Sequence, residues 1–372
     1  MKIIIIGGGI AAAEAASAAR KQSPDAVITV YSAETEYPYR RPALSSLVAN
    51  SATPAGFLVK SADFYAANSI GFFTGSAVTA IDTVKRTVTL ANGTSDTFDR
   101  LIIATGAQCR KLPIPGMELE QVFSLRDLDD LDRINRRIAA GVKNAVILGG
   151  GILGLETAES MLDGGISEVV IVERSGHLLT RQMDREAADF LQKSLERPGL
   201  RIITGASAAG ITEKSVTLDN GMEIAADLVL VSAGAVADTA LAAAAGIKVH
   251  HGIVTDSTMQ SSVPGIYAAG DVAEVIDRCY GTYMPARDMG QVAGTNAAGG
   301  DARFTAAFQP FRAVLSGVKI FSAGDLSGEG RTTVDDRGNF RREFFNRDGE
   351  LTGGVLIGDV SGAMKLQNAL KG

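Results

Sequence analysis

Cysteine, histidine and tryptophan are scarce in this sequence. Its 372 residues include two cysteines, three histidines and no tryptophan. Cys109 and Cys279 lie far apart and form no C-x-x-C or C-x4-C arrangement, so we interpret both as structural thiols. His177, His250 and His251 lack the spacing of metal ligands. The sequence therefore predicts neither a dithiol redox centre nor a metal site.

Long apolar runs and an excess of positive charge are also missing. The longest purely aliphatic runs, such as residues 3–6, fall far short of the roughly 20 residues of a membrane span. The first residues do not resemble a signal peptide, because the apolar run is short and enters glycines at once. A net charge of −6 argues against a nucleic-acid partner. We expect a cytoplasmic protein of two or three domains with no membrane partner.

What the sequence does contain is glycine at informative places, beginning with its first fourteen residues. An isoleucine run enters Gly7-Gly-Gly9 and continues as an alanine-rich segment, which predicts a strand, a tight turn and a helix. Gly7 allows the turn, Gly9 lets a diphosphate approach the backbone, and Ala12 lets the helix pack closely on the strand. The diphosphate would lie at the positive N-terminus of the helix. Taken alone, the pattern also fits a strand-to-helix turn in another kind of α/β protein.

The same pattern occurs a second time. The apolar residues 145–148 lead into Gly149 and Gly151, with Gly154 in the packing position. Two such units in one chain predict two dinucleotides, each bound by its own βαβ segment.

An acid near the end of the second strand of such a unit is expected to bind the adenosine ribose. After the strand predicted at 27–31 the candidate is Glu34, with Glu36 as the alternative, although a solvated loop carboxylate is also compatible. The next segment, 37–45, is rich in proline and arginine. Such a loop can direct an arginine at a phosphate, or it can be an ordinary charged surface loop.

The second unit places its acid more regularly. The strand predicted at 168–172 delivers Glu173, nineteen residues beyond Gly154, where an acid that binds ribose hydroxyls is expected. This position favours NADH. The adjacent Arg174 would suit a 2′-phosphate, so NADPH stays open as the alternative.

Three further strands are predicted to end in small residues, where backbone can pass close to a ligand. In the last of them Asp271 can hydrogen-bond a polyol chain, cap a helix, or do both. Asn92-Gly93 and Asn220-Gly221 predict hairpin turns, and 124–140 predicts a solvated surface helix. The three strand ends are Ala104-Thr105-Gly106, Ser232-Ala-Gly234 and Ala269-Gly270-Asp271.

Over residues 1–305, these landmarks in this order resemble the two-dinucleotide flavoprotein reductases, the superfamily of glutathione-reductase-like enzymes. The resemblance implies an α/β fold with two Rossmann-like dinucleotide-binding domains and a small C-terminal α/β domain. It also implies that the first unit and the Ala-Gly-Asp segment hold FAD, and that the second unit holds the nicotinamide dinucleotide. The expected domains are an FAD-binding domain at 1–112 and 237–306, an NAD(P)H-binding domain at 113–236, and a C-terminal domain at 307–372.

Within that superfamily, residues 38–44 resemble a loop of NADH:rubredoxin reductases and of the NADH-binding part of assimilatory nitrite reductases. This implies that Arg41 meets the FAD and that Glu34 serves its ribose. Related carrier reductases have a lysine shortly after this loop, where the present chain has Ser45 and Ser46.

By the same resemblance Glu156 touches the nicotinamide, the alternative being a first-turn glutamate that merely suits the helix dipole. The helix after Met284 is expected to point its N-terminus at the flavin N1–C2 carbonyl edge and to stabilise negative charge there.

The loop at 42–46 contains no cysteine, which excludes thiol chemistry. Disulphide reductases of this superfamily need two redox cysteines, and relatives that act on peroxide or coenzyme A disulphide need one near 42–46, where this chain has none. The resemblance to NADH:rubredoxin reductases then implies hydride transfer from NADH to FAD, followed by electron transfer to a small one-electron carrier such as rubredoxin. The alternatives are an NADH-oxidising module of a nitrite-reductase-like system and a flavin-bound NADH sensor.

The C-terminal segment is too short for the full dimerisation domain of disulphide reductases, so we expect a monomer. It contains arginines interleaved with phenylalanines, which fit either a basic docking surface for an acidic carrier or an amphipathic strand with a charged face. These residues are Arg337, Phe340, Arg341, Arg342, Phe344, Phe345 and Arg347.

Overall fold

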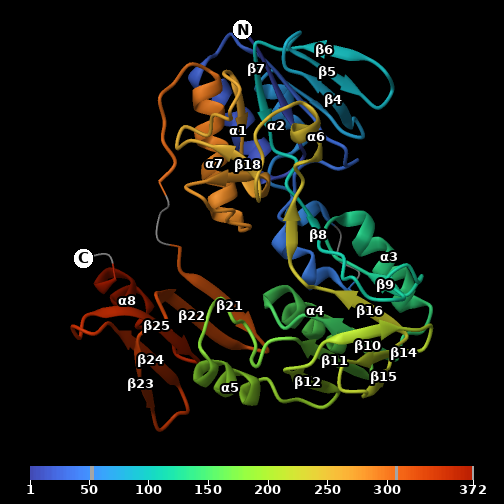
Figure 1. Ribbon diagram of the computed structural model, residues 1–372, viewed down its shortest axis with the longest axis vertical. Helices are drawn as coiled ribbons and strands as arrows, with labels where there is room; N and C mark the ends of the chain where they lie inside the picture. The colour runs from blue at the N-terminus through green and yellow to red at the C-terminus, as the bar shows by residue number, and fades with distance from the viewer. Residues whose placement is uncertain (51–53, 306–308, 371–372) are drawn as a thin grey trace. The chain divides into compact units, whose positions relative to one another are not determined.

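The structure is a computed structural model that describes residues 1–50, 54–305 and 309–370 (Figure 1). The chain forms two compact units. The first comprises Met1–Pro42, Thr53–Gln108 and Ala235–Ala306, and the second comprises Ala43–Ala52, Cys109–Gly234 and Ala307–Gly372.

The first unit is built on a five-stranded parallel sheet in the order β19-β7-β1-β2-β3. Its central strand consists of one lysine and four isoleucines, and Ile3, Ile4 and Ile5 are fully buried, as expected for a parallel strand covered on both faces. The strands are β1 (Lys2–Ile6), β2 (Val27–Tyr31), β3 (Ile70–Phe73), β7 (Arg100–Ile103) and β19 (Ile266–Ala268).

Helices and smaller sheets complete this unit, of which β4-β5-β6 is antiparallel and β18-β20 is parallel. A three-stranded sheet contains the hairpin turn predicted at Asn92-Gly93. The helices are α1 (Ile10–Gln22), α2 (Ala62–Ala67), α6 (Ala240–Ala244) and α7 (Tyr283–Ala297). The other strands are β4 (Val78–Asp82), β5 (Thr87–Leu90), β6 (Ser95–Thr97), β18 (Ile253–Thr255) and β20 (Ala273–Val275).

The second unit repeats the parallel sheet, in the order β12-β11-β10-β16-β9. The predicted helix at 124–140 is α3, which is shorter because the Asp127 side chain caps it by accepting from the Asp130 N–H. The strands are β9 (Val122–Phe123), β10 (Asn144–Leu148), β11 (Glu168–Glu173), β12 (Leu200–Thr204) and β16 (Leu228–Val231). The helices are α3 (Leu128–Ala139), α4 (Ile152–Asp163) and α5 (Arg185–Ser194).

A three-stranded antiparallel sheet, with the predicted turn at Asn220-Gly221, packs with this half and contributes to one apolar core with β10, β11 and β16. Its strands are β13 (Ala208–Ile211), β14 (Ser215–Leu218) and β15 (Glu223–Ala225).

The C-terminal part of the second unit is an antiparallel sheet in the order β21-β22-β25-β24-β23, with one helix packed on β22 and β25 (Figure 1). Phe321 and Leu366 are buried between sheet and helix. The elements are β21 (Phe311–Leu315), β22 (Val318–Gly324), β23 (Glu329–Val334), β24 (Phe340–Phe345), β25 (Leu351–Ile357) and α8 (Ala363–Ala369). The predicted fold class, two Rossmann-like halves and a small α/β domain, is confirmed.

The chain passes between the units after Gln108 and after Gly234, where β8 (Ala107–Cys109) and β17 (Ala235–Ala237) pair with each other. These crossings lie within a few residues of the expected boundaries at 112 and 236. The segment Ala43–Ala52 differs from the expectation, which placed it in the first domain. The physical reason is that Leu44, Leu47 and Val48 are buried and that this segment packs on α4.

Candidate dinucleotide-binding sites

The first glycine-rich turn lies at the carboxyl ends of β1 and β7. Gly7 has φ +132°, and a Cβ on it would lie 2.1 Å from the Ala104 carbonyl oxygen. The Gly7 N–H donates to Tyr31 O (2.9 Å), and the Ala104 N–H donates to Ile6 O (2.7 Å). The structure therefore brings together two of the predicted landmarks, and only glycine fits the first of them.

Beyond this turn, the N-terminus of α1 is open. Gly9 is the N-cap with φ −94°, no side chain caps the helix, and a Cβ on Gly9 would meet no atom within 4 Å. Ala12 is fully buried against the sheet. Open space in front of unsatisfied helix N–H groups is what a diphosphate requires, so the residues present fit a dinucleotide.

The Ala269-Gly270-Asp271 segment reaches the same edge of the sheet. The Ala269 N–H donates to Ile103 O (3.0 Å), and Gly270 has φ +82°. A Cβ on Gly270 would lie 2.9 Å from the Cβ of Ala11, at the start of α1. Asp271 thus lies near the first turn, in the short 3-10 helix Gly270–Val272.

Helix α7 packs directly on α1, and the two lie side by side in Figure 1. A Cβ on Gly290 would lie 2.3 Å from Ala11 O, and one on Gly294 would lie 2.1 Å from Ala15 O. Two glycines one turn apart thus allow the helix backbones to approach closely. Sequence reasoning missed these glycines, although their four-residue spacing was the available signal.

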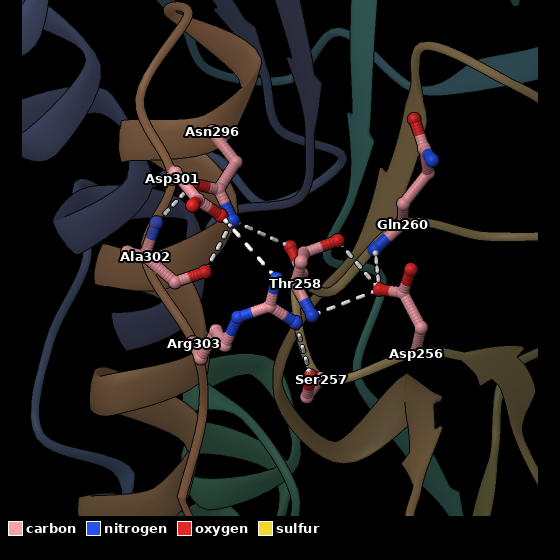
Figure 2. A network of polar contacts seen from close by, with 8 residues as sticks. All are labelled: Asp256, Ser257, Thr258, Gln260, Asn296, Asp301, Ala302 and Arg303. Atoms are coloured by element: carbon pink, nitrogen blue, oxygen red, sulfur yellow. Dashed lines mark hydrogen bonds and ion pairs between the residues drawn. The ribbon is translucent and has the colours of Figure 1, made fainter.

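Figure 2 shows how the C-terminal end of α7 is fastened. The Asn296 side-chain amide donates to Thr258 O and to Ala302 O (both 2.8 Å), while its oxygen accepts from the Ala302 N–H (2.6 Å). The Asp256 carboxylate accepts from the Thr258 N–H (2.8 Å) and so fixes the turn that contains Thr258. The network fixes the C-terminal end of α7, while Gly290 and Gly294 hold the middle and the C-terminal part of the helix against α1.

Glu34 and Arg41, both predicted to contact FAD, form an ion pair with each other. The Tyr39 hydroxyl also donates to Glu34 (2.7 Å) and accepts from Arg41 (3.1 Å). The pairing places the predicted acid and the predicted arginine in one cluster of the first unit. Their contacts with a cofactor remain predictions.

The second glycine-rich turn has the same construction. Gly149 has φ +128°, and a Cβ on it would lie 2.3 Å from the Ser232 carbonyl oxygen at the end of β16. A Cβ on Gly154 would lie 2.2 Å from Gly149 O, whereas one on Gly151 would meet no atom within 4 Å. The second helix N-terminus is therefore open as well, with Gly151 as its N-cap.

Glu173 lies beside this turn. One carboxylate oxygen accepts from the Gly150 N–H and the other from the Ser175 N–H, both at 2.7 Å. The carboxylate is thus held beside the second glycine-rich turn, and its contact with a ribose stays a prediction. Arg174 is exposed next to it.

Three of the remaining predicted residues lie near the points where the chain passes from one unit to the other. In the first unit the Thr105 hydroxyl donates to Asp238 O (2.9 Å), and Gly106 O accepts from the Asp238 N–H (2.9 Å). In the second unit Gly234 has φ +92°, and its carbonyl accepts from the Arg110 N–H (3.0 Å).

Glu156 lies on the second turn of α4 and accepts a hydrogen bond from the Ser45 hydroxyl (2.7 Å). Burial raises the pKa of its carboxyl, and the bond from Ser45 opposes that rise. Neither Ser45 nor this bond was foreseen, because the two residues are 111 positions apart in the sequence.

Cys109 and Cys279 are both free and half-buried. Burial raises the pKa of both thiols, which keeps the reactive thiolate scarce at neutral pH. Within residues 1–50, 54–305 and 309–370, no three His, Cys, Asp or Glu side chains are grouped as a metal site would require. In the same residues, no helix is both long and apolar enough to cross a membrane.

Most of these arginines and phenylalanines in the C-terminal segment are buried or paired with other residues of the second unit. Phe340 and Phe344 are buried, and the Phe340 ring lies 4.7 Å from that of Phe190 on α5. Arg342, with 13% of its side chain exposed, forms an ion pair at 2.7 Å with Asp184, the N-cap of α5. These contacts favour the amphipathic strand over the docking surface.

Comparison with known proteins gives two family matches. Residues 1–291 match the pyridine nucleotide-disulphide oxidoreductases, and residues 314–372 match the rubredoxin NAD+ reductase C-terminal domain. The NADH-rubredoxin oxidoreductase of Clostridium acetobutylicum is 33% identical over 99% of this chain and 94% of its own length. The solved NADH:rubredoxin oxidoreductase from that organism has a TM-score of 0.85 at 30% identity, covering 100% of this chain and 94% of that chain.

Two relatives from Bacillus subtilis are longer. The assimilatory nitrate reductase electron transfer subunit and the NAD(P)H nitrite reductase are each 30% identical, over 92% and 98% of this chain. The chain spans about half the length of these relatives, 45% and 46% respectively. Together the matches show that the chain belongs to the pyridine nucleotide-disulphide oxidoreductase family and carries a rubredoxin NAD+ reductase C-terminal domain.

Proposed function

We propose that the protein is an NADH-dependent FAD oxidoreductase that passes electrons one at a time to a small carrier protein of the rubredoxin type. The observation that carries this proposal is the pair of open helix N-termini, at Gly9 and Gly151, each behind a glycine turn that a side chain would block. Two such turns suit two dinucleotides. When bound, FAD supplies the chemistry that accepts a hydride and releases single electrons.

In this proposal the first unit holds FAD. The open turn receives the diphosphate, Arg41 supplies positive charge and Glu34 binds the ribose, while Asp271 binds the polyol chain. The small residues let backbone lie against the cofactor. The full set is Gly7, Gly9, Ala12, Glu34, Arg41, Ala104, Thr105, Gly106, Gly270 and Asp271.

The second unit holds NADH. Glu173 accepts hydrogen bonds from the ribose hydroxyls and thereby disfavours a 2′-phosphate, while Glu156 contacts the nicotinamide. The full set is Gly149, Gly151, Gly154, Glu156, Glu173 and Gly234. The domain division is then FAD at 1–112 and 237–306, NADH at 113–236 and the C-terminal domain at 307–372, apart from residues 43–52.

The carrier is inferred from the C-terminal match and from the similarity to the NADH-rubredoxin oxidoreductase. A second candidate is an NADH-oxidising module that feeds a nitrite-reductase-like partner, which the 30% identity to the Bacillus subtilis nitrite reductase supports. A monomer in the cytoplasm fits the first candidate.

The deciding experiment is an anaerobic stopped-flow mix of the purified protein with NADH, followed by oxidised rubredoxin. We expect rapid bleaching of the flavin band and then rapid reduction of the carrier. Bleaching without transfer would contradict the rubredoxin assignment and direct the search to another acceptor or to a sensing role. Absence of a flavin band after reconstitution with FAD would contradict the whole proposal.

One variant tests the cofactor site directly. Asp271→Ala removes the carboxylate assigned to the polyol chain, so we expect protein that purifies with little FAD. Full flavin occupancy of this variant would contradict that role.

A further inference from the structure

Residues 43–50 form a segment that we call the strap. In sequence it lies between two parts of the first unit, yet it belongs to the second unit. Its centre is the short 3-10 helix Ser45–Leu47, which packs against α4. Leu44, Leu47 and Val48 are buried, with no more than 3% of their surface exposed. Apolar burial therefore holds the strap on the unit that contains Glu156.

Polar contacts fix the position of the strap along the second unit. The Asn135 side chain on α3 accepts from the Ala49 N–H (2.8 Å) and donates to Leu47 O (3.2 Å). Ala49 has φ +58°, in the left-handed region. Its Cβ would lie 2.3 Å from a Cβ on Gly164, the C-cap of α4, so the glycine makes room for it. Ala49 thus keeps a strained backbone conformation because α3 and the end of α4 both contact it. Such strain persists only where the surrounding structure fixes the position of the segment.

In this position of the strap, Ser45 lies next to Glu156. Ser45 is 2% exposed, and its hydroxyl donates to the Glu156 Oε2 at 2.7 Å. A bond between two partly or fully buried side chains restricts the rotamers of both.

The charged side chains around Glu156 do not stabilise its ionised carboxylate, so the Ser45 hydroxyl is the main contact that does. On α4, Glu159 is the charged neighbour and raises the pKa of the Glu156 carboxyl further. On β11, Glu173 is held by two backbone N–H groups. On β21, the Arg312 guanidinium lies over the Phe321 ring. The 3-10 helix of the strap and β10 contribute no charged side chain.

We propose that Ser45 is the positioning residue for Glu156: its hydroxyl holds Oε2 and so directs Oε1 to accept from the nicotinamide carboxamide of NADH. This inference rests on the proposed function. Ser45 acts through Glu156, while the strap and Asn135 fix where the hydroxyl lies. Ser45 thereby also favours the ionised carboxylate, the form that accepts the stronger hydrogen bond.

The test compares Ser45→Ala with Ser46→Ala as the matched control. Ser46 is exposed, and its hydroxyl donates to Ala43 O in the same segment (2.8 Å). Three quantities are measured: the rate constant of flavin reduction by NADH across pH, the dissociation constant of NAD+ by calorimetry, and the pKa of the Glu156 carboxyl by infrared difference spectroscopy against Glu156→Gln. The last readout needs neither NADH nor turnover.

Loss of one hydrogen bond to a carboxylate should lower the rate constant by roughly three- to tenfold. It should also weaken NAD+ binding and move the carboxyl titration to higher pH. Ser46→Ala should behave as wild type, and Ser45→Thr, which keeps the hydroxyl, should restore much of the loss. In a Glu156→Ala background, Ser45→Ala should change the rate less than about twofold, because the partner is gone.

Two results would overturn the inference. One is identical behaviour of Ser45→Ala and Ser46→Ala in all three measurements. The other is an undiminished effect of Ser45→Ala in the Glu156→Ala background. Failure of the proposed function is recognised separately, because wild-type protein would then show no flavin reduction by NADH.

Discussion

The two glycine-rich halves of this chain are built alike up to the turn and differently beyond it. In each, the first glycine has a φ near +130° and faces a carbonyl oxygen at the end of the neighbouring strand, Ala104 O or Ser232 O. In each, the next glycine but one caps a helix with open space in front of it. A diphosphate site needs only backbone in the right conformation, so few residues specify it.

The two acids that we propose for ribose binding show where the halves diverge. The strand registers make Ser32 the counterpart of Glu173, because Tyr31 pairs with Ile6 as Val172 pairs with Leu148. Glu173 bonds the turn itself through the Gly150 N–H. Ser32 lies against the equivalent Gly8, and the acid of the first half, Glu34, comes two residues later. A side-chain function thus depends on the path of the following loop, which the glycine pattern does not describe.

The helices that follow the turns are covered differently too. Glu14 on α1 and Glu156 on α4 occupy equivalent positions after their glycines. Glu14 accepts from Gln291 on α7 (2.8 Å), whereas Glu156 accepts from Ser45 on the strap (2.7 Å). The glutamate of the first half thus contacts a long helix, and that of the second half contacts a short segment. Both partners are distant in the sequence.

The largest effect is expected from alanine at the first glycine of either half. Gly7→Ala or Gly149→Ala puts a Cβ within 2.3 Å of a carbonyl oxygen at a φ that alanine rarely adopts. We expect a loss of about 3 kcal/mol or more in the free energy of unfolding, measured with urea. Gly7→Ala should also lose FAD, whereas Gly149→Ala should lose NADH binding and keep FAD.

Gly9→Ala and Gly151→Ala are the matched controls, because both positions are open and have negative φ. Both variants should unfold like wild type, while each weakens binding of its own dinucleotide. Loss of flavin in Gly149→Ala or Gly151→Ala would contradict the assignment of one dinucleotide to each half.

The next largest effect is expected where α7 packs on α1. Gly294→Ala forces a Cβ to within 2.1 Å of Ala15 O, and the two helices must separate to accept it. We expect a loss of about 1–3 kcal/mol in unfolding free energy and weaker FAD binding. Gly299→Ala, which meets no atom but has φ +95°, measures the cost of backbone strain alone.

A smaller effect on stability, but a clear one on binding, is expected for the acid of the second half. Glu173→Ala removes a carboxylate held by two N–H groups beside the turn. We expect the KM for NADH to rise roughly tenfold, with FAD content unchanged. Ser32→Ala, at the equivalent place in the first half, should leave NADH kinetics as in wild type. An unchanged KM in Glu173→Ala would show that the ribose acid is assigned wrongly.

The smallest effect concerns the pH dependence of stability. Burial raises the pKa of the Glu156 carboxyl in the folded protein above its unfolded value. Its contribution to stability is therefore complete below the unfolded pKa and is lost as pH rises through the folded pKa. Glu156→Gln cannot ionise, so its melting temperature should fall less than that of wild type between acidic and neutral pH. Ser46→Ala removes no carboxyl and serves as the control.

Some features could be predicted from short-range patterns because local chemistry decides them. The isoleucine run of β1 lies in a buried parallel strand, and the turns at Asn92-Gly93 and Asn220-Gly221 form hairpins. The helix predicted at 124–140 shortened at its start, because the Asp127 cap decides where α3 begins. Each prediction rests on a conformation that few residue types adopt.

Contacts between distant segments could not be predicted in this way. The Arg342–Asp184 ion pair, the Gly294–Ala15 approach and the Ser45–Glu156 bond each join residues more than a hundred positions apart. Nothing in the local sequence of Ser45 distinguishes it from Ser46. The fold buries the first and leaves the second exposed.

The sequence by itself determined the two glycine turns, the strands and helices around them, and the absence of cysteine from the loop at 42–46. Glycine spacing and apolar runs act over a few residues, so they can be read directly. Only the tertiary structure decided that residues 43–50 pack on the second unit, that α7 packs on α1, and that Ser45 bonds Glu156. These arrangements depend on burying apolar surface from separate segments together, and that free energy belongs to the assembled core rather than to any one stretch of chain.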